Sequence, residues 1–416
     1  MRLFNTLSQT VEPLVPRKNC ITLYVCGITP YDTTHLGHAF INVIYDSLVR
    51  YLRWRGVDVV YTQNVTDIDD DILRKARELG TTWDELGRRE TQRYLTDLRD
   101  LNVEMPTHYV RASQETTMMV RLIEELLRDK LAYEVDGWVY YSVRNDPDFG
   151  RLADAAGYVG YEQWLATANE RGNNPDDPRK NDPLDFVLWQ HQQAGEPAWD
   201  SPWGPGRPGW HIECSAMAVK YLGEQVDIHG GGADLMFPHH TCEIAQSENA
   251  TGKHPFVCIW MHCAMVMLDG EKMSKSLGNL VLVRNLLRDF TPDAVRVLLL
   301  SHHYRDVWEY FEHDMAASAA LASRLAGAAA VATTGDPTAD DDGAHQARVE
   351  FIAALEDDFQ TPKALAALDR LATRIHETHS AAQSAMLREL SATIGLQLSN
   401  ALITGAEPHY AGVDGA

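Results

Sequence analysis

The sequence lacks any long hydrophobic run. Its start, MRLFNTLSQTVEPLVPRK, has no continuous apolar segment. No later stretch approaches the roughly 20 apolar residues that a membrane helix needs. We therefore expect a cytoplasmic protein without a secretory signal or a membrane span.

Positive charge is also scarce. The 416 residues include 37 Lys and Arg against 59 Asp and Glu, which gives a formal net charge of −22. Such a surface repels phosphate backbones unless its basic residues are clustered. A general polyanion-binding role is therefore disfavoured.

Cysteine is rare as well. The six cysteines are Cys20, Cys26, Cys214, Cys242, Cys258 and Cys263. In a cytoplasmic protein, metal binding or free thiols are more usual than disulfides. Disorder is excluded by the 45% hydrophobic content.

Hydrophobic spacing predicts a βαβ unit near the start of the chain. Apolar alternation favours a buried strand over 19–26, helical spacing favours a helix over 38–56, and β-branched residues favour a strand over 57–63. A βαβ unit predicts parallel strands, and its first turn is where such sheets bind ligands. Thr82 and Glu85 have the spacing of a capping box before another helix.

Composition divides the rest of the chain. The segment 145–208 is rich in Gly, Pro, Asn and Asp, as expected of an insertion. We expect these units: the first half of an α/β sheet domain (1–144), the insertion (145–208), the second half of that domain (209–290), a helical region (291–334), a helical bundle (335–402) and a tail (403–416).

Four residues form a candidate metal site. His239 and Glu243 are four apart and would share one helix face. With Cys26 and Cys214 they would make a donor set that suits zinc better than magnesium or calcium. Because the residues are scattered along the chain, spacing alone leaves open that they are buried thiols and a core histidine.

Two segments suggest a nucleotide site. His35-Leu36-Gly37-His38 lies at the strand-to-helix turn, where a helix N-terminus favours phosphate. Downstream, the loop 270–279 carries Lys272 and Lys275, which could neutralise pyrophosphate. Either pair alone is better explained as solvated surface, but the two together in this order favour phosphate chemistry. Asp234, after a glycine run, could accept a hydrogen bond from a ribose hydroxyl.

These motifs resemble a known family. HLGH and KMSKS look like the signatures of class I aminoacyl-tRNA synthetases. VCGITPYDTTHLGHA, NVTDIDDDI, KNDPLDFVLW, HGGGADLMFPHH and DGEKMSKSLGN resemble cysteinyl-tRNA synthetase over nearly the whole chain. The resemblance implies an α/β fold with a Rossmann-like parallel sheet, an inserted subdomain and a C-terminal helical bundle. It also implies activation of L-cysteine by ATP with Mg²⁺, and one zinc ion per chain.

The resemblance also implies roles for particular residues. The expected catalytic residues are His35, His38, Lys272 and Lys275. The expected contacts to the adenylate and the amino acid are Cys26, Gly27, Ile28, Thr29, Ile41, Asn64, Val65, Thr66, Trp210, Gly232, Ala233, Asp234 and Val266. The expected zinc ligands are Cys26, Cys214 and His239, with Glu243 as a possible fourth.

Some features are closer to a related group, the cysteine ligases of mycothiol synthesis. These are CGITP, GPGRPGW, HHYRDVWEY and the segment 170–175, ERGNNP, which is similar to a ligase motif. They imply a monomer that joins cysteine to the amine of glucosaminyl-inositol and binds no nucleic acid. The candidates for the acceptor side are His302, His303, Arg305 and Trp308. Glu243, Ile41 and Asn173-Asn174 depart from the ligase pattern.

Three alternatives stay open. The first is a cysteinyl-tRNA synthetase, although we expect no basic anticodon-reading domain in this chain. The second is an enzyme that loads cysteine onto a carrier protein or another amine. The third is an inactive paralogue that serves as a binding module, which the intact motifs argue against.

Overall fold

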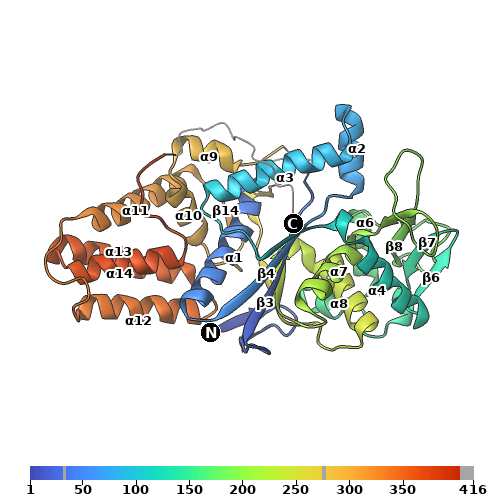
Figure 1. The fold of residues 1–416 in the computed structure, drawn as a ribbon, viewed down its shortest axis with the longest axis horizontal. Helices are drawn as coiled ribbons and strands as arrows, with labels where there is room; N and C mark the ends of the chain where they lie inside the picture. Colours follow the sequence, from blue (N-terminus) through green and yellow to red (C-terminus); the bar gives the residue numbers. More distant parts are fainter. Residues whose placement is uncertain (31–33, 274–277, 403–416) are drawn as a thin grey trace.

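The computed structural model describes residues 1–30, 34–273 and 278–402. Figure 1 shows helices α11 to α14 at one end of an elongated molecule and strands β6 to β8 at the other, with the strands β3 and β4 between them. The predicted residue Lys275 lies outside the described residues.

The central sheet is parallel and has five strands. Their order is β11 (Val257–Cys263), β10 (Val226–Gly232), β3 (Cys20–Ile28), β4 (Asp58–Val65) and β5 (His108–Arg111). All four neighbouring pairs run parallel. The predicted βαβ unit is therefore confirmed, with α1 (Leu36–Trp54) as its crossover helix.

Sequence pattern explains these elements. β3 is buried over most of its length because helices cover both faces of a parallel sheet. The predicted capping box of α3 (Trp83–Asp100) is also confirmed: Thr82 accepts from the backbone N–H of Glu85, and the Glu85 side chain accepts from that of Thr82. The other helices before the insertion are α2 (Asp70–Leu79) and α4 (Thr116–Arg128).

The segment predicted as an insertion is more ordered than its composition suggests. It contains α5 (Arg151–Ala155) and α6 (Tyr161–Glu170). An antiparallel sheet joins β6 (Ala132–Val135), β7 (Trp138–Tyr141), β8 (Phe186–His191) and β9 (Gly206–Pro208). Two of its strands precede residue 145, so this sheet starts earlier in the chain than the change in composition does.

Apart from its strands, the second half of the chain is mainly helical. They are α7 (Trp210–Leu222), α8 (Thr241–Thr251), α9 (Val283–Asp289), α10 (Pro292–Leu300), α11 (Glu312–Ala330), α12 (Asp342–Glu356), α13 (Thr361–Thr378) and α14 (Ala381–Thr393). Short strands β1 (Arg2–Asn5) and β2 (Thr10–Pro13) pair at the N-terminus. A small sheet joins β13 (Glu271–Lys272), β12 (Val266–Leu268) and β14 (Trp308–Glu309).

The glycine run before Asp234 lies within a strand and not in a turn. Gly230 to Gly232 are the end of β10 and pair with β11. A Cβ at Gly230 would come within 1.9 Å of the Tyr45 hydroxyl and 2.0 Å of the Met261 carbonyl. Glycine is therefore required here by close packing in the sheet rather than by a turn.

Candidate functional site

A cleft of about 1250 Å³ opens at the carboxyl end of the central sheet. Its walls come from the end of β3, the start of α1, the insertion and the segment after β10. Cys26, His38, Trp210, Asp234 and Lys272 all line it. Open α/β sheets bind ligands at this edge, because helix N-termini and strand ends meet there.

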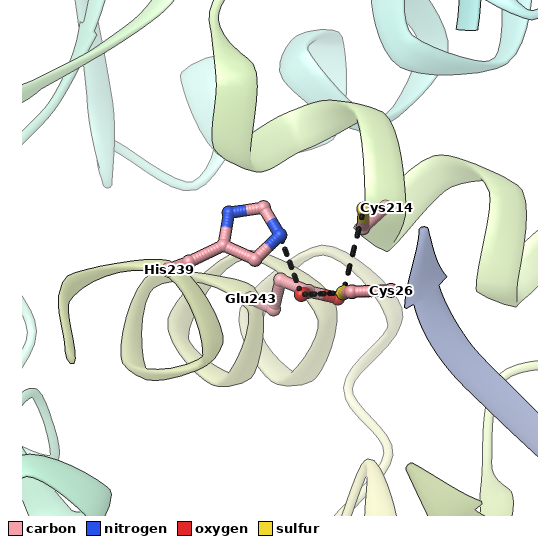
Figure 2. A group of neighbouring side chains, drawn as sticks. All are labelled: Cys26, Cys214, His239 and Glu243. Atoms are coloured by element: carbon pink, nitrogen blue, oxygen red, sulfur yellow. Dashed lines mark hydrogen bonds and ion pairs between the residues drawn. The ribbon is translucent and has the colours of Figure 1, made fainter. Parts of the chain in front are cut away.

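Four buried side chains with metal-binding chemistry meet beside this cleft. The thiol sulfurs of Cys26 and Cys214 are 3.7 Å apart, and Cys26 Sγ is 3.6 Å from Glu243 Oε1. His239 Nε2 is 3.1 Å from the same carboxylate oxygen. Figure 2 shows the four converging: Cys26 comes from β3, Cys214 from α7, His239 from the turn η4 (Met236–His240) and Glu243 from α8. One ligand atom from each lies within 4.8 Å of the others, so the structure brings all four predicted ligands together.

Burial controls the protonation of this group. It raises the pKa of Cys26 and of Glu243. Burial opposes ionisation of Cys214 too, but the hydrogen bond from Cys26 and the nearby His239 lower the pKa of Cys214 to about 7. One thiol thus supports ionisation of the other. A cation would favour deprotonation of both thiols and of the carboxyl group.

His239 is held in place by two residues, of which sequence reasoning named Trp210 only as an amino-acid contact and missed His211. The Nδ1 atoms of His211 and His239 are 2.9 Å apart, so one ring donates to the other. The Trp210 ring stacks on His239 with centroids 4.4 Å apart. The free Nε2 of His239 therefore points to Glu243. Burial and His239 lower the pKa of His211, which favours its neutral form.

A second set of histidines contacts Cys26 and Glu243. His240 Nε2 is 3.3 Å from Cys26 Sγ, and its Nδ1 is 2.7 Å from His262 Nε2. His229 Nε2 lies 3.2 Å from Glu243 Oε2. Cys26, His229, His240 and Glu243 therefore form a second group with metal-ligand spacing. The only sequence signal for it was the density of histidines around the glycine run.

The HLGH turn adopts a helix-start geometry. His35 is the N-cap of α1, and its Nδ1 accepts from the backbone N–H of Gly37 at 3.1 Å. The His35 and His38 rings stack with centroids 3.8 Å apart. The backbone N–H of Leu36 donates to the carbonyl of Val281. The segment after the lysine loop is therefore attached to the turn.

Lys272 forms an ion pair with Asp234, the residue expected to contact the ribose. Its Nζ is 2.8 Å from Asp234 Oδ2. Both side chains are partly exposed, 47% for Lys272 and 37% for Asp234, so this pair adds little stability. Because the ion pair is weak, either side chain can leave it and bind a ligand in the cleft.

The other expected contacts fall into two sets. Those that line the cleft are Cys26, Gly27, Ile28, Thr29, Ile41, Trp210, Gly232, Asp234 and Val266. Asn64, Val65, Thr66 and Ala233 are not among the lining residues. Asn64 lies behind the wall, where its Oδ1 accepts from the backbone N–H of Gly27 at 2.9 Å. Asn64 therefore holds the backbone of the cleft wall in place and does not face the space where a ligand would bind.

The four candidates for the acceptor side do not line the cleft. His303 and Arg305 contact Asp358, which follows α12. His302 stacks on Trp308 with centroids 4.0 Å apart. Their role toward an acceptor therefore stays a prediction. The HHYRDVW segment instead contacts Asp358 through Arg305 and pairs with β12 through Trp308.

Comparison with known proteins agrees with these observations. The family model for tRNA synthetases class I (C) catalytic domain matches residues 12–320, and the DALR domain matches residues 350–399. A cysteine–tRNA ligase of Legionella pneumophila (strain Paris) is 43% identical over 95% of this chain and 85% of its own length. The L-cysteine:1D-myo-inositol 2-amino-2-deoxy-alpha-D-glucopyranoside ligase of Thermomonospora curvata is 43% identical over 89% of this chain and 87% of its own.

A solved structure shows the same fold. The methionyl-tRNA synthetase of Mycobacterium tuberculosis, in complex with methionyl-adenylate, covers 91% of this chain and 90% of its own, with a TM-score of 0.62 and 14% identity. Among the described residues, no helix is long and apolar enough to cross a membrane. The expected α/β fold, with a Rossmann-like parallel sheet, is confirmed. The chain belongs to the cysteinyl-tRNA synthetase family of class I ATP-dependent ligases.

Proposed function

We propose that this protein activates L-cysteine with ATP, forming cysteinyl-adenylate and diphosphate. One observation carries the proposal: Cys26 belongs both to the group of metal-ligand side chains and to the wall of the cleft that holds the HLGH turn. An amino acid whose sulfur is anchored near Cys26 would therefore have its carboxylate beside the nucleotide.

The donor set fits zinc. Two thiols and one imidazole are ligands that zinc prefers, and the fourth position would be filled by the carboxylate or by the substrate. Glu243 Oε2 is buried and has no hydrogen-bond partner, although His229 lies 3.2 Å away. A bound zinc ion would hold the substrate sulfur as a thiolate. The hydroxyl of serine is a hard donor that such a site binds poorly.

Residues of the chain would then position the two substrates. We assign Trp210, which is 36% exposed at the cleft, to pack on the amino acid. His35, His38 and Lys272 would stabilise negative charge on the phosphates, with Lys275 as the untested fourth group. Asp234 would accept from the ribose once Lys272 turns to the phosphates. Positioning and electrostatics supply most of the rate in such a transfer.

Exchange of labelled diphosphate into ATP tests the activation step. Cysteine should support exchange and serine should not, because a direct bond to the distinguishing atom can discriminate by about 10⁵-fold. Cys214→Ser should abolish exchange, whereas Cys20→Ser, at the half-buried start of β3, should not. Equal exchange with serine, or full activity of Cys214→Ser, would refute the proposal.

Glucosaminyl-inositol is one candidate acceptor. Its amine would attack the adenylate carbonyl, forming an amide and releasing AMP. The T. curvata ligase supports it, as does the polar wall that the insertion adds to the cleft through Asn173, Asp177, Arg179 and Lys180. The cleft exceeds the roughly 1,000 Å³ upper range of small-molecule pockets, which leaves room beside an adenylate.

A tRNA is the second candidate, and the comparisons favour it. Most of the similar curated relatives carry the name cysteine–tRNA ligase. Purified protein with cysteine and ATP should be offered glucosaminyl-inositol and tRNA in parallel, with labelled cysteine followed into each product. Transfer to only one acceptor decides between them, and transfer to neither favours a different amine.

A further inference from the structure

Arg171 connects the insertion to the segment between Asp234 and His239. It lies at the C-terminal end of α6 and lines the cleft. Its Nη1 donates to the backbone carbonyls of Asp234 and Phe237. One guanidinium group therefore bridges two points on the opposite wall.

The segment that Arg171 contacts carries both the expected ribose contact, Asp234, and the expected zinc ligand, His239. Asp234 lies in the short helix η3 (Ala233–Leu235), and His239 lies in the next turn, η4 (Met236–His240). Between them, Phe237 is extended, with φ −139° and ψ 136°, so the helical path is broken there. Carbonyls beside such a break lack regular helical partners, and an arginine can supply the missing donors.

Tyr158, also from the insertion, supports the arginine. The Arg171 guanidinium lies 5.9 Å from the centre of the Tyr158 ring, and its Nη2 is 3.5 Å from the Tyr158 hydroxyl. The same ring packs against Phe237, with centroids 5.9 Å apart. Two residues of the insertion thus contact the break from one side.

We propose that Arg171 is a positioning residue that sets the backbone between Asp234 and His239, and so controls both metal affinity and nucleotide affinity. This inference rests on the proposed function for the identity of the two ligands. Arginine fits this position because Nη1 alone serves both carbonyls while Nη2 and the guanidinium plane stay on Tyr158. A lysine ammonium is a point charge without the second nitrogen and the planar group that meet Tyr158.

The test compares Arg171→Ala and Arg171→Lys with matched variants of Arg144. Arg144 is also in the insertion, stacks on Tyr161 at 3.9 Å and pairs with Asp182, but does not line the cleft. Zinc affinity of the purified chains is measured by competition with a chromophoric chelator. The KM values for ATP and cysteine are measured by diphosphate exchange, and folding by thermal denaturation.

Arg171→Ala should weaken zinc binding about 10- to 100-fold, as loss of a residue that orients a ligand does. It should also raise the KM for ATP, and Arg171→Lys should restore little. The Arg144 variants should bind as wild type. The inference is overturned if Arg171→Ala and Arg171→Lys bind zinc and ATP as wild type, or if the Arg144 variants lose as much. If Arg171→Ala does not fold, the folded Arg171→Lys decides. Wild-type protein that binds no zinc would contradict the proposed function instead.

Discussion

At the scale of single residues, His239 shows how much a ligand depends on its neighbours. Its Nδ1 meets His211, its ring face meets Trp210, and its Nε2 is left for Glu243. A histidine ligand whose second nitrogen is hydrogen-bonded has a defined tautomer and orientation. Sequence spacing identified His239 but not this support.

We therefore expect His211→Ala to lower zinc affinity about 10- to 100-fold. His211→Gln should recover part of the loss, because its amide can still bond to His239 Nδ1. Chelator competition measures both. His376→Ala, on the exposed face of α13, serves as the control and should have no effect. Unchanged affinity in His211→Ala would show that Trp210 and Glu243 suffice to orient His239.

Asp69 predicts a pH dependence of stability. Its side chain caps α2 by accepting from the backbone N–H of Asp71 at 2.8 Å. Burial, with repulsion from Asp71 and Asp70, raises the pKa of Asp69 to about 6. The folded state thus holds a proton that the unfolded chain has already lost, so this carboxyl lowers stability as pH rises from about 4 to 6.

Asp69→Asn should remove that cost, since asparagine caps helices equally well. Two pKa units correspond to about 3 kcal/mol, so the variant should be more stable by up to that amount at pH 8. At pH 4 the gain should vanish. Urea denaturation at both pH values measures the difference. A gain of equal size at pH 4 would mean that charge is not the cause.

At the scale of elements, a buried arginine joins α1, the crossover helix of the sheet, to the helical half of the molecule. Arg296 of α10 is fully buried and lies 2.7 Å from Asp46 of α1. It also donates to the carbonyls of Leu101 and Ile394. One side chain therefore links a crossover helix, a loop after α3 and the turn after α14.

Removing this link should be costly. Arg296→Met should destabilise the protein by about 3–5 kcal/mol, because it leaves a buried carboxylate and buried carbonyls short of donors. Arg288→Met, on the exposed side of α9, is the control. Urea denaturation of the two variants and the wild type measures the cost. A loss below about 1 kcal/mol would show that Arg50, which also bonds Asp46, compensates.

Some elements could be predicted from their sequence pattern and others could not, and the difference has a physical cause. The βαβ unit and the capping box of α3 follow from spacing within one or two turns, and both were predictable. The strand through Gly230 was not, because this glycine is required by contact with Tyr45 and Met261, far away in sequence. Nothing local distinguishes such a strand from a glycine turn.

At the scale of the whole molecule, the charge of −22 bears on the acceptor. Transfer to a sugar amine displaces few counterions and should change little between 50 and 200 mM salt. Binding of a polyanion through several phosphate contacts should fall steeply over that range. The KM for each acceptor, measured across the salt series with diphosphate exchange as the control, should show this difference. A flat tRNA profile would argue against a phosphate-reading surface.

The sequence by itself determined the βαβ unit of β3, α1 and β4, the family motifs and the chemical types of the ligand side chains. These depend on backbone periodicity and on which atoms a residue carries, both of which are local. His239 and Glu243 could be paired from their spacing because four positions correspond to about one helical turn, and η4 runs directly into α8.

Only the tertiary structure decided which distant residues meet. Cys26 and Cys214 are 188 positions apart, yet their sulfurs are 3.7 Å apart because α7 packs beside the end of β3. Likewise, His302 to Trp308 do not line the cleft, and Arg171 reaches the carbonyl of Phe237, 66 positions away. Contacts of this kind are set by how whole elements bury their surfaces against one another, which no local pattern records.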